Sequence, residues 1–234
     1  MSLAVQTDAV PTSYVPRETT VLSRCRRRRV LHLGCIGMTE GTASERLRFF
    51  ESPSSLHSRL RDVARLVIGI DVDAEIVSKL HERGRDDVRL CDAEELETLD
   101  RTVGDAGFEV VLAGDIIEHL SNPGRMLEGA KELTAPGGEL ILTTPNAFGL
   151  PNYMRFSTGR FREGDDHVQS FQPFTLRNLL QRHGWTIVLV TTCFQESTPH
   201  RTGRTVFAAG RRVFERWPKW GGTLLVVSRL GSGA

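Results

Sequence analysis

The sequence is poor in cysteine, and the cysteines that it has form no pattern. None of them belongs to a CxxC pair or to the ligand spacing of a zinc site. A disulfide framework and a zinc fold are therefore disfavoured, and reduced thiols in a cytosolic protein are the simplest expectation. The four cysteines are Cys25, Cys35, Cys91 and Cys193.

Long apolar runs and an excess of one charge are also missing. No stretch approaches the ~20 apolar residues that cross a bilayer, and no signal segment opens the chain. The formal net charge of +1 gives no overall field toward nucleic acid or a membrane surface. The local exception, RCRRRR at 24–29, predicts either a targeting or nucleic-acid patch or, as we favour, a solvated run before a buried strand. The expected partner is a small molecule, bound by a monomer or a homodimer.

The chain does contain a clear alternation of strands and helices. Amphipathic segments over 74–83, 174–183 and 203–217 predict helices, and a further helix is expected over 54–65. Apolar runs without polar alternation are typical of strands that are covered on both faces, as in a parallel sheet. Seven such runs lie at 30–33, 67–70, 88–91, 108–113, 139–144, 185–192 and 223–228. The order predicts an α/β fold, a doubly wound three-layer sandwich.

A single domain over 21–234 is expected, with a flexible leader or flap over 1–20 and a lid insertion at about 147–173. The insertion shows no clear periodicity and is longer than an ordinary loop. Its aromatic content argues against disorder, and we expect it to form the wall that faces the substrate. Three residues are predicted to contact the substrate: Asn146, Tyr153 and Phe171.

Four successive strands end in an acid or a glycine turn and the fifth ends in Thr144-Pro145-Asn146, and ligands of doubly wound folds bind outside these carboxyl ends. Asp71, after the second strand, suits the two ribose hydroxyls, although capping of the next helix explains it equally well by itself. Asp92, after the third strand, suits the exocyclic amine of adenine. The turn from Gly34 to Gly37, after the first strand, lets the backbone approach a ligand closely. Together these features fit a nucleoside that carries an amino-acid tail.

Two longer motifs carry a family resemblance. They read FEVVLAGDIIEHLSNPG at 108–124 and LTAPGGELILTTPN at 133–146. With them the sequence resembles the class I S-adenosylmethionine-dependent methyltransferases, and looks closest to small-molecule enzymes of the ubiquinone-pathway type. The resemblance runs from about residue 28 to about residue 230. It implies a seven-stranded, mostly parallel sheet of order 3-2-1-4-5-7-6, with strand seven antiparallel.

The resemblance also implies a cofactor site for S-adenosylmethionine, with S-adenosylhomocysteine as its product. The glycine turn would hold the methionine end, Asp71 the ribose, and Asp115 would lie near the sulfonium. Asp92 and the backbone of Ala93 would read the adenine. The full set of expected cofactor residues is His32, Gly34, Cys35, Gly37, Asp71, Val72, Asp92, Ala93 and Asp115.

The glycine turn departs from the family pattern at two positions. His32 stands where the family has an acid, and Ile36 stands where it has a second glycine. A side chain at Ile36 is expected to narrow the approach, and a histidine cannot act as a carboxylate toward the cofactor's ammonium. Either other groups keep the binding, with Gly37 supplying flexibility, or cofactor affinity is lost and the chain is a non-catalytic scaffold or regulatory protein.

The acid and histidine residues near the fourth strand allow three roles. His119 or His167 could act as a general base toward a hydroxyl, with Asp115 beside them. Glu118, His119 and His167 could instead hold a divalent metal, a pattern similar to that of small-RNA 2′-O-methyltransferases. In the third interpretation Glu118 pairs locally and His119 packs beside the cofactor. A metal is possible but is not the expected state.

The predicted function is S-adenosylmethionine-dependent O-methylation of a small-molecule acceptor, such as a secondary metabolite or a glycosylated compound. His119, His167 and Asp115 are the predicted catalytic residues. A metal-dependent RNA 2′-O-methyltransferase and a non-catalytic scaffold are the alternatives. An RNA enzyme should carry a basic groove, which the near-neutral charge does not favour.

Overall fold

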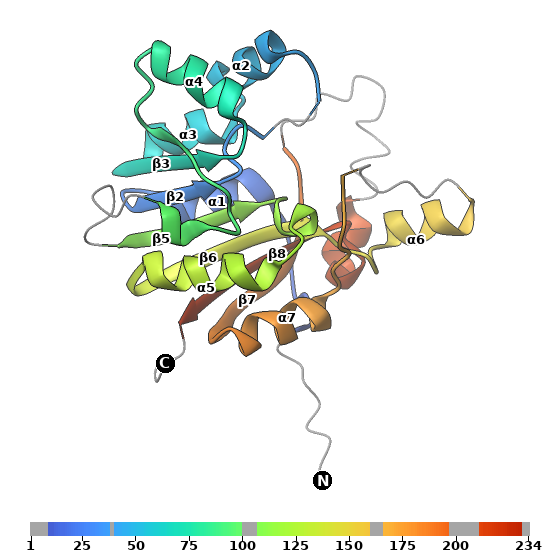
Figure 1. Ribbon diagram of the computed structural model, residues 1–234. Helices are drawn as coiled ribbons and strands as arrows, with labels where there is room; N and C mark the ends of the chain where they lie inside the picture. The colour runs from blue at the N-terminus through green and yellow to red at the C-terminus, as the bar shows by residue number, and fades with distance from the viewer. Residues whose placement is uncertain (1–8, 38–39, 100–106, 160–165, 197–210, 231–234) are drawn as a thin grey trace.

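The computed structural model describes residues 9–37, 40–99, 107–159, 166–196 and 211–230. Their strands form one eight-stranded sheet of order β1-β7-β8-β6-β5-β2-β3-β4 (Figure 1). β8 is antiparallel to both of its neighbours, and the other pairs are parallel. The strands are β1 (Tyr14–Pro16), β2 (Arg29–Leu33), β3 (Leu66–Asp71), β4 (Val88–Leu90), β5 (Phe108–Gly114), β6 (Thr134–Pro145), β7 (Trp185–Phe194) and β8 (Thr223–Leu230).

The seven predicted strands are all present, and β2 to β8 follow the predicted spatial order. The eighth strand, β1, is the difference. It pairs in parallel with the end of β7, Thr192–Phe194, and so covers the backbone groups that this edge would otherwise expose. Helix α1 (Arg17–Cys25) follows it directly. Within the expected leader or flap over 1–20, residues 14–20 thus belong to β1 and α1, and residues 1–8 lie outside the described part.

Helices cover both faces of the sheet. α5 and α7 pack on one face and α1 and α3 on the other, while α2 and α4 form a smaller cluster near β4 (Figure 1). The further helices are α2 (Ala43–Glu51), α3 (Leu56–Val63), α4 (Ala74–Glu82), α5 (Pro123–Leu133), α6 (Leu150–Ser157) and α7 (Pro173–Arg182). Three of them confirm the helices expected over 54–65, 74–83 and 174–183. Of the helix expected over 203–217, residues 211–216 are helical and 203–210 lie outside the described residues.

The basic run at 24–29 is partly used inside the protein. Glu139 on β6 is buried, and it accepts hydrogen bonds from Arg24 and Arg28 at 3.1 and 3.0 Å. Arg229 on β8 donates to its other oxygen at 2.7 Å. Burial alone would raise the pKa of Glu139, but the bonds from Arg229 and Arg28 hold that pKa below its ordinary value. The run therefore ties α1 to the sheet, which the prediction of a wholly solvated run did not include.

Among the helices of the described residues, none combines the length and the apolar character that crossing a membrane requires.

Candidate active site

A cavity of about 980 Å³ lies at the carboxyl ends of β2, β3, β4 and β5. The predicted cofactor residues meet there, as the rule for doubly wound sheets requires. Residues from α1, from the segment 49–56 and from the segment after 165 also contribute to the lining. Of the predicted site residues, the cavity is lined by His32, Gly34, Cys35, Gly37, Asp71, Val72, Asp92, Ala93, Asp115, His119 and His167.

The glycine turn after β2 needs glycine for two reasons at Gly34. Its φ of 63° is a left-handed conformation, and a Cβ built there would lie 3.0 Å from Cδ1 of Ile116. Gly37 is also left-handed, with φ of 69°. Ile36 is buried and belongs to the same apolar cluster as Leu47, and it is also among the residues that line the cavity. The expectation that Ile36 narrows the approach to the turn stays a prediction.

Asp71 ties the end of β3 to the glycine turn. Its Oδ2 accepts the N–H of Ile36 at 3.0 Å, and its Oδ1 accepts the N–H of Asp73 at 3.2 Å. Asp73, not Asp71, caps α4, because its Oδ1 accepts the N–H of Ile76 at 3.1 Å. Burial raises the pKa of Asp71. Since each carboxylate oxygen has a second lone pair, the group can still accept from two ligand hydroxyls.

The end of β4 supplies a small, partly buried corner of the cavity. Asp92 accepts the N–H of Glu94 through Oδ1 at 2.8 Å, and Ala93 is buried. Val72, at the end of β3, has 64% of its surface exposed. Cys35 is buried, and burial raises the pKa of its thiol well above the ordinary value. A structural role suits Cys35 better than a reactive one.

Asp115 is held by a residue that the sequence did not single out. Arg17 on α1 reaches the cavity and places Nη1 2.8 Å from Oδ2 of Asp115. Thr143 donates its hydroxyl to Oδ1 of Asp115 at 2.9 Å and accepts from Arg17 at 2.9 Å. Asp115 has a φ of 51°, uncommon for a residue with a side chain. The ring of three groups keeps this conformation in place.

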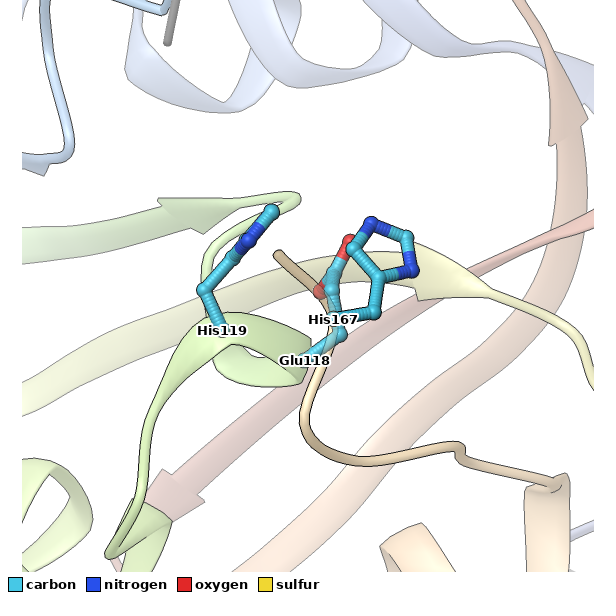
Figure 2. Close-up of side chains that lie close together, drawn as sticks. All are labelled: Glu118, His119 and His167. Carbon is cyan, nitrogen blue, oxygen red and sulfur yellow. The ribbon is translucent and has the colours of Figure 1, made fainter. Parts of the chain in front are cut away.

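Glu118, His119 and His167 lie close together (Figure 2), and the two histidines line the cavity. The first two end the short 3₁₀ helix η4 (Ile117–His119), and one donor atom from each of the three lies within 4.8 Å of the others. The two imidazoles meet edge to face, with centroids 4.7 Å apart. Nδ1 of His119 lies 3.2 Å from Oδ2 of Asp166. The cluster thus joins η4 to the connection that precedes α7.

Glu118 is the buried member of this cluster. Thr144 donates its hydroxyl to Oε2 at 2.9 Å. Burial, and secondarily the charge of Asp115, raise the pKa of Glu118 to about 7. The backbone carbonyl of Glu118 accepts the N–H groups of Val168 and Gln169, both at 3.0 Å. These bonds fix the segment that carries His167.

The three predicted substrate residues do not meet in the cavity. Asn146 is fully buried, and its side chain donates to the carbonyl of Gly221 and accepts the N–H of Phe148, so its amide is engaged in holding the chain. Phe171 lies in the main core, and Tyr153 is 65% exposed on α6. Their prediction as a substrate-contacting set differs from the structure, in which Asn146 and Phe171 are structural.

Comparison with known proteins places the chain in a family. A methyltransferase-domain model matches residues 48–190, more than half of the chain. A probable S-adenosylmethionine-dependent methyltransferase of Mycolicibacterium smegmatis is 29% identical over 166 residues, which are 70% of this chain and 54% of that protein. The chain thus spans about half the length of this curated relative. The family match begins after the glycine turn, where the sequence departs from the family pattern.

Solved structures share the fold. A SAM-dependent methyltransferase from Archaeoglobus fulgidus superposes with a TM-score of 0.55 at 17% identity, covering 91% of this chain and 90% of that one. Magnesium protoporphyrin IX methyltransferase from Synechocystis PCC 6803 with bound SAH gives 0.56 at 14% identity, covering 92% and 82%.

The fold, the cavity and the family match agree. The chain belongs to the methyltransferase-domain family and is of the class I, S-adenosylmethionine-dependent type. The cavity suits the cofactor of that class, S-adenosylmethionine with S-adenosylhomocysteine as product. The cavity is lined by the backbone of the glycine turn. It is also lined by carboxylates such as Asp71, whose oxygens can accept further hydrogen bonds.

Proposed function

We propose that this protein methylates a hydroxyl oxygen of a small-molecule acceptor, with S-adenosylmethionine as the methyl donor. The observation that carries the proposal is the His119–Asp166 pair beside His167 at the cavity edge. When bound, the cofactor supplies a methyl group on a sulfonium, which a nucleophile in line with the carbon–sulfur bond displaces. The task left to the protein is to position the acceptor oxygen and to take its proton.

His119 is the proposed general base. Nδ1 of His119 lies 3.2 Å from Oδ2 of Asp166, a carboxylate oxygen that can only accept, and this favours the tautomer with hydrogen on Nδ1 and a lone pair on Nε2. Nε2 then receives the acceptor's hydroxyl proton as the oxygen–carbon bond forms. His167, whose ring packs against that of His119, restricts the imidazole and borders the space for the acceptor. Asp115 stays paired with Arg17 and serves to orient the ligand.

The cofactor residues keep the roles that the resemblance implies. The turn from Gly34 to Gly37 would lie along the amino-acid tail, Asp71 would accept from the ribose hydroxyls, and Asp92 with Ala93 would hold the adenine. The support is their shared place at one cavity wall. The segment 147–173 is the proposed lid, because α6 places exposed aromatic side chains beyond the strand ends. These would suit a ring-bearing or glycosylated acceptor.

The first test is calorimetric titration of the ligand-stripped protein with S-adenosylmethionine and S-adenosylhomocysteine. We expect micromolar binding, lowered about tenfold or more in Asp71→Asn, because hydrogen bonds from the hydroxyls to a charged acceptor are replaced. Asp62→Asn, which changes an exposed carboxylate of α3, is the matched control. Absence of binding in the parent protein would contradict the proposal and favour a scaffold.

The second test follows methyl transfer itself. Protein supplied with methyl-labelled cofactor is incubated with a panel of phenols, catechols and sugar hydroxyl compounds, and labelled product is measured. Turnover with any hydroxyl compound that falls in His119→Asn would support the oxygen assignment. Turnover only with amines or thiols would overturn it.

One observation favours a second candidate, a metal-assisted transfer. Ligands of one ion at about 2.0–2.2 Å must have their donor atoms within about 4.4 Å of one another. Glu118, His119 and His167 come close to this, with donor atoms within 4.8 Å. Titration with Mg²⁺, Mn²⁺ and Zn²⁺, followed by activity with and without a chelator, separates the two mechanisms. Binding that is lost in Glu118→Gln, with activity that needs the ion, would replace the general-base mechanism.

A further inference from the structure

Three polar side chains, those of His32, His57 and Asp87, contact one another in series, and this chain of side chains starts at the cavity wall. His32 on β2 and His57 on α3 place their Nδ1 atoms 3.3 Å apart, and Nε2 of His57 lies 3.2 Å from Oδ2 of Asp87. Both histidines are buried. Gly69 on β3 makes room for His57, because a Cβ there would lie 2.7 Å from Cε1 of His57. The proposed general base and cofactor contacts make no use of His57 or Asp87.

Asp87, at the outer end of this chain of side chains, determines which nitrogen of His57 carries a hydrogen. Asp87 accepts from Arg85 at 3.0 and 3.1 Å and faces Nε of Arg61 at 3.0 Å. Burial by itself would raise the pKa of Asp87, but the bonds from His57 and Arg85 hold it well below the ordinary range. Asp87 is therefore a carboxylate that only accepts, so Nε2 of His57 carries a hydrogen.

The same reasoning fixes the remaining protons. Burial lowers the pKa of His57 even beside Asp87, so the ring is neutral and its Nδ1 is bare. Nδ1 of His32 must then donate the hydrogen in the contact between the two rings. Burial, and then the electrostatic interaction with His57 and with Arg17, lower the pKa of His32 as well. A neutral His32 with its hydrogen on Nδ1 has a bare Nε2.

The bare Nε2 of His32 is available to a ligand in the cavity. His32 lines the cavity, and within the described part of the chain no residue hydrogen-bonds to Nε2. The ends of β3 and β4 already supply acceptors for the ribose and the adenine, so the end of β2 is left for the amino-acid tail. That tail offers an ammonium, which only donates, and a carboxylate, which only accepts.

We propose that the Asp87–His57 pair holds His32 as a neutral acceptor whose Nε2 binds the ammonium of the cofactor's amino-acid tail. His57 and Asp87 are positioning residues and do not touch the ligand. The inference rests on the proposed function in one respect, that the ligand is S-adenosylmethionine or S-adenosylhomocysteine. It explains how the site works with a histidine at a position where an acid would be expected.

Calorimetry with two ligands and four variants tests the proposed roles of His32, His57 and Asp87. The ligands are S-adenosylhomocysteine and its des-amino analogue, which has hydrogen in place of the amino group. His32→Leu should lower the affinity for S-adenosylhomocysteine about tenfold and leave the analogue unchanged, because only one ligand offers the donor. Asp87→Asn should give a smaller loss, again only for the first ligand. His81→Leu, which changes a histidine of α4 outside the cavity, is the matched control.

The fourth variant, His57→Gln, tests positioning against simple packing. A glutamine amide can donate to Asp87 and accept from His32, so it preserves the pattern of protons. We expect it to retain the preference for S-adenosylhomocysteine over the des-amino analogue. A loss of affinity for both ligands in parallel in all three chain variants would overturn the proposal, because it would show a merely structural role.

Nitrogen NMR of the imidazoles gives a second readout. Spectra of protein labelled with ¹⁵N-histidine, assigned by the signals lost in His32→Leu and His57→Gln, should show hydrogen on Nδ1 of His32 and on Nε2 of His57. The opposite tautomers would overturn the proposal. If the parent protein binds neither ligand, the proposed function fails; if it binds both equally, only this inference fails.

Discussion

The cofactor cavity (the cofactor end) and the proposed acceptor wall on α6 (the acceptor end), whose residues are not among those that line the cavity, are built differently. At the cofactor end, two carboxylates already have partners within the protein. Asp71 accepts the N–H of Ile36, and Asp115 is paired with Arg17. At the acceptor end, α6 has no buried residue, and Phe148 and Phe156 are each 69% exposed. The cofactor end is thus preorganised, whereas the acceptor end consists largely of exposed side chains.

This difference matches the chemistry of the two ligands. A cofactor that is the same in every turnover is served by fixed backbone and locked side chains. An acceptor has to enter and leave, and an open wall of aromatic groups allows that. Changes at the cofactor end should therefore alter binding or stability, while changes on α6 should alter only the use of the acceptor.

The largest effect is expected at the junction of the two ends. His119→Asn should lower the rate of methyl transfer about 100-fold, the scale of a lost general base. Cofactor affinity should change less than twofold. Single-turnover rates and calorimetry check this on one preparation. An equal loss of rate in His183→Asn, a histidine outside this cavity, would show that the effect is not specific.

A second effect concerns stability at the junction. Because the folded protein holds the pKa of Glu118 at about 7, against an ordinary 4.5, it favours the protonated group. This contribution is complete below pH 4.5 and is lost as the pH rises through 7, with an upper limit of about 3 kcal/mol. Urea unfolding from pH 5 to 8 with chelator present measures it. Glu118→Gln should flatten that dependence; a parallel slope in the variant would assign it to another group.

The cofactor end should respond to pH in the opposite direction. Burial lowers the pKa of His32 and of His57 in the folded protein, so the unfolded chain takes up their protons first as the pH falls below about 6.5. Stability should fall by about 1.4 kcal/mol per pH unit for each ring that stays neutral. His57→Gln should remove one such contribution and His81→Leu should not. Unfolding curves between pH 6.5 and 5 give the slopes.

The smallest effect is expected on α6. Tyr153→Ser and Phe156→Ser change exposed side chains, so the free energy of unfolding should shift by no more than about 0.5 kcal/mol. Cofactor affinity should be unchanged, and KM for the acceptor should rise a few-fold. Steady-state kinetics with the best acceptor measure KM in both variants. An unchanged KM in both variants would remove α6 from the acceptor wall.

Sequence predicted the cofactor end better than the rest. Buried strands and the residues that follow them carry a strong local signal, and the fold brings their ends to one edge. The pairing of Arg17 with Asp115 carries no such signal, because it joins segments far apart in the chain. The same holds for His32 and His57, which come from separate elements and meet in the fold, where Gly69 leaves space for His57. Asn146 has the right place in the chain for a ligand contact, yet its amide is used to fix a turn.

β1 and α1 determine where a clone for expression can begin. A clone that starts at residue 48, where the family match begins, would lack β1, α1 and β2. Without β2 the sheet would lack the strand between β3 and β5. The glycine turn and Arg17 would be lost as well. A boundary chosen by similarity alone would remove half of the cofactor wall, and a usable clone must begin before Tyr14.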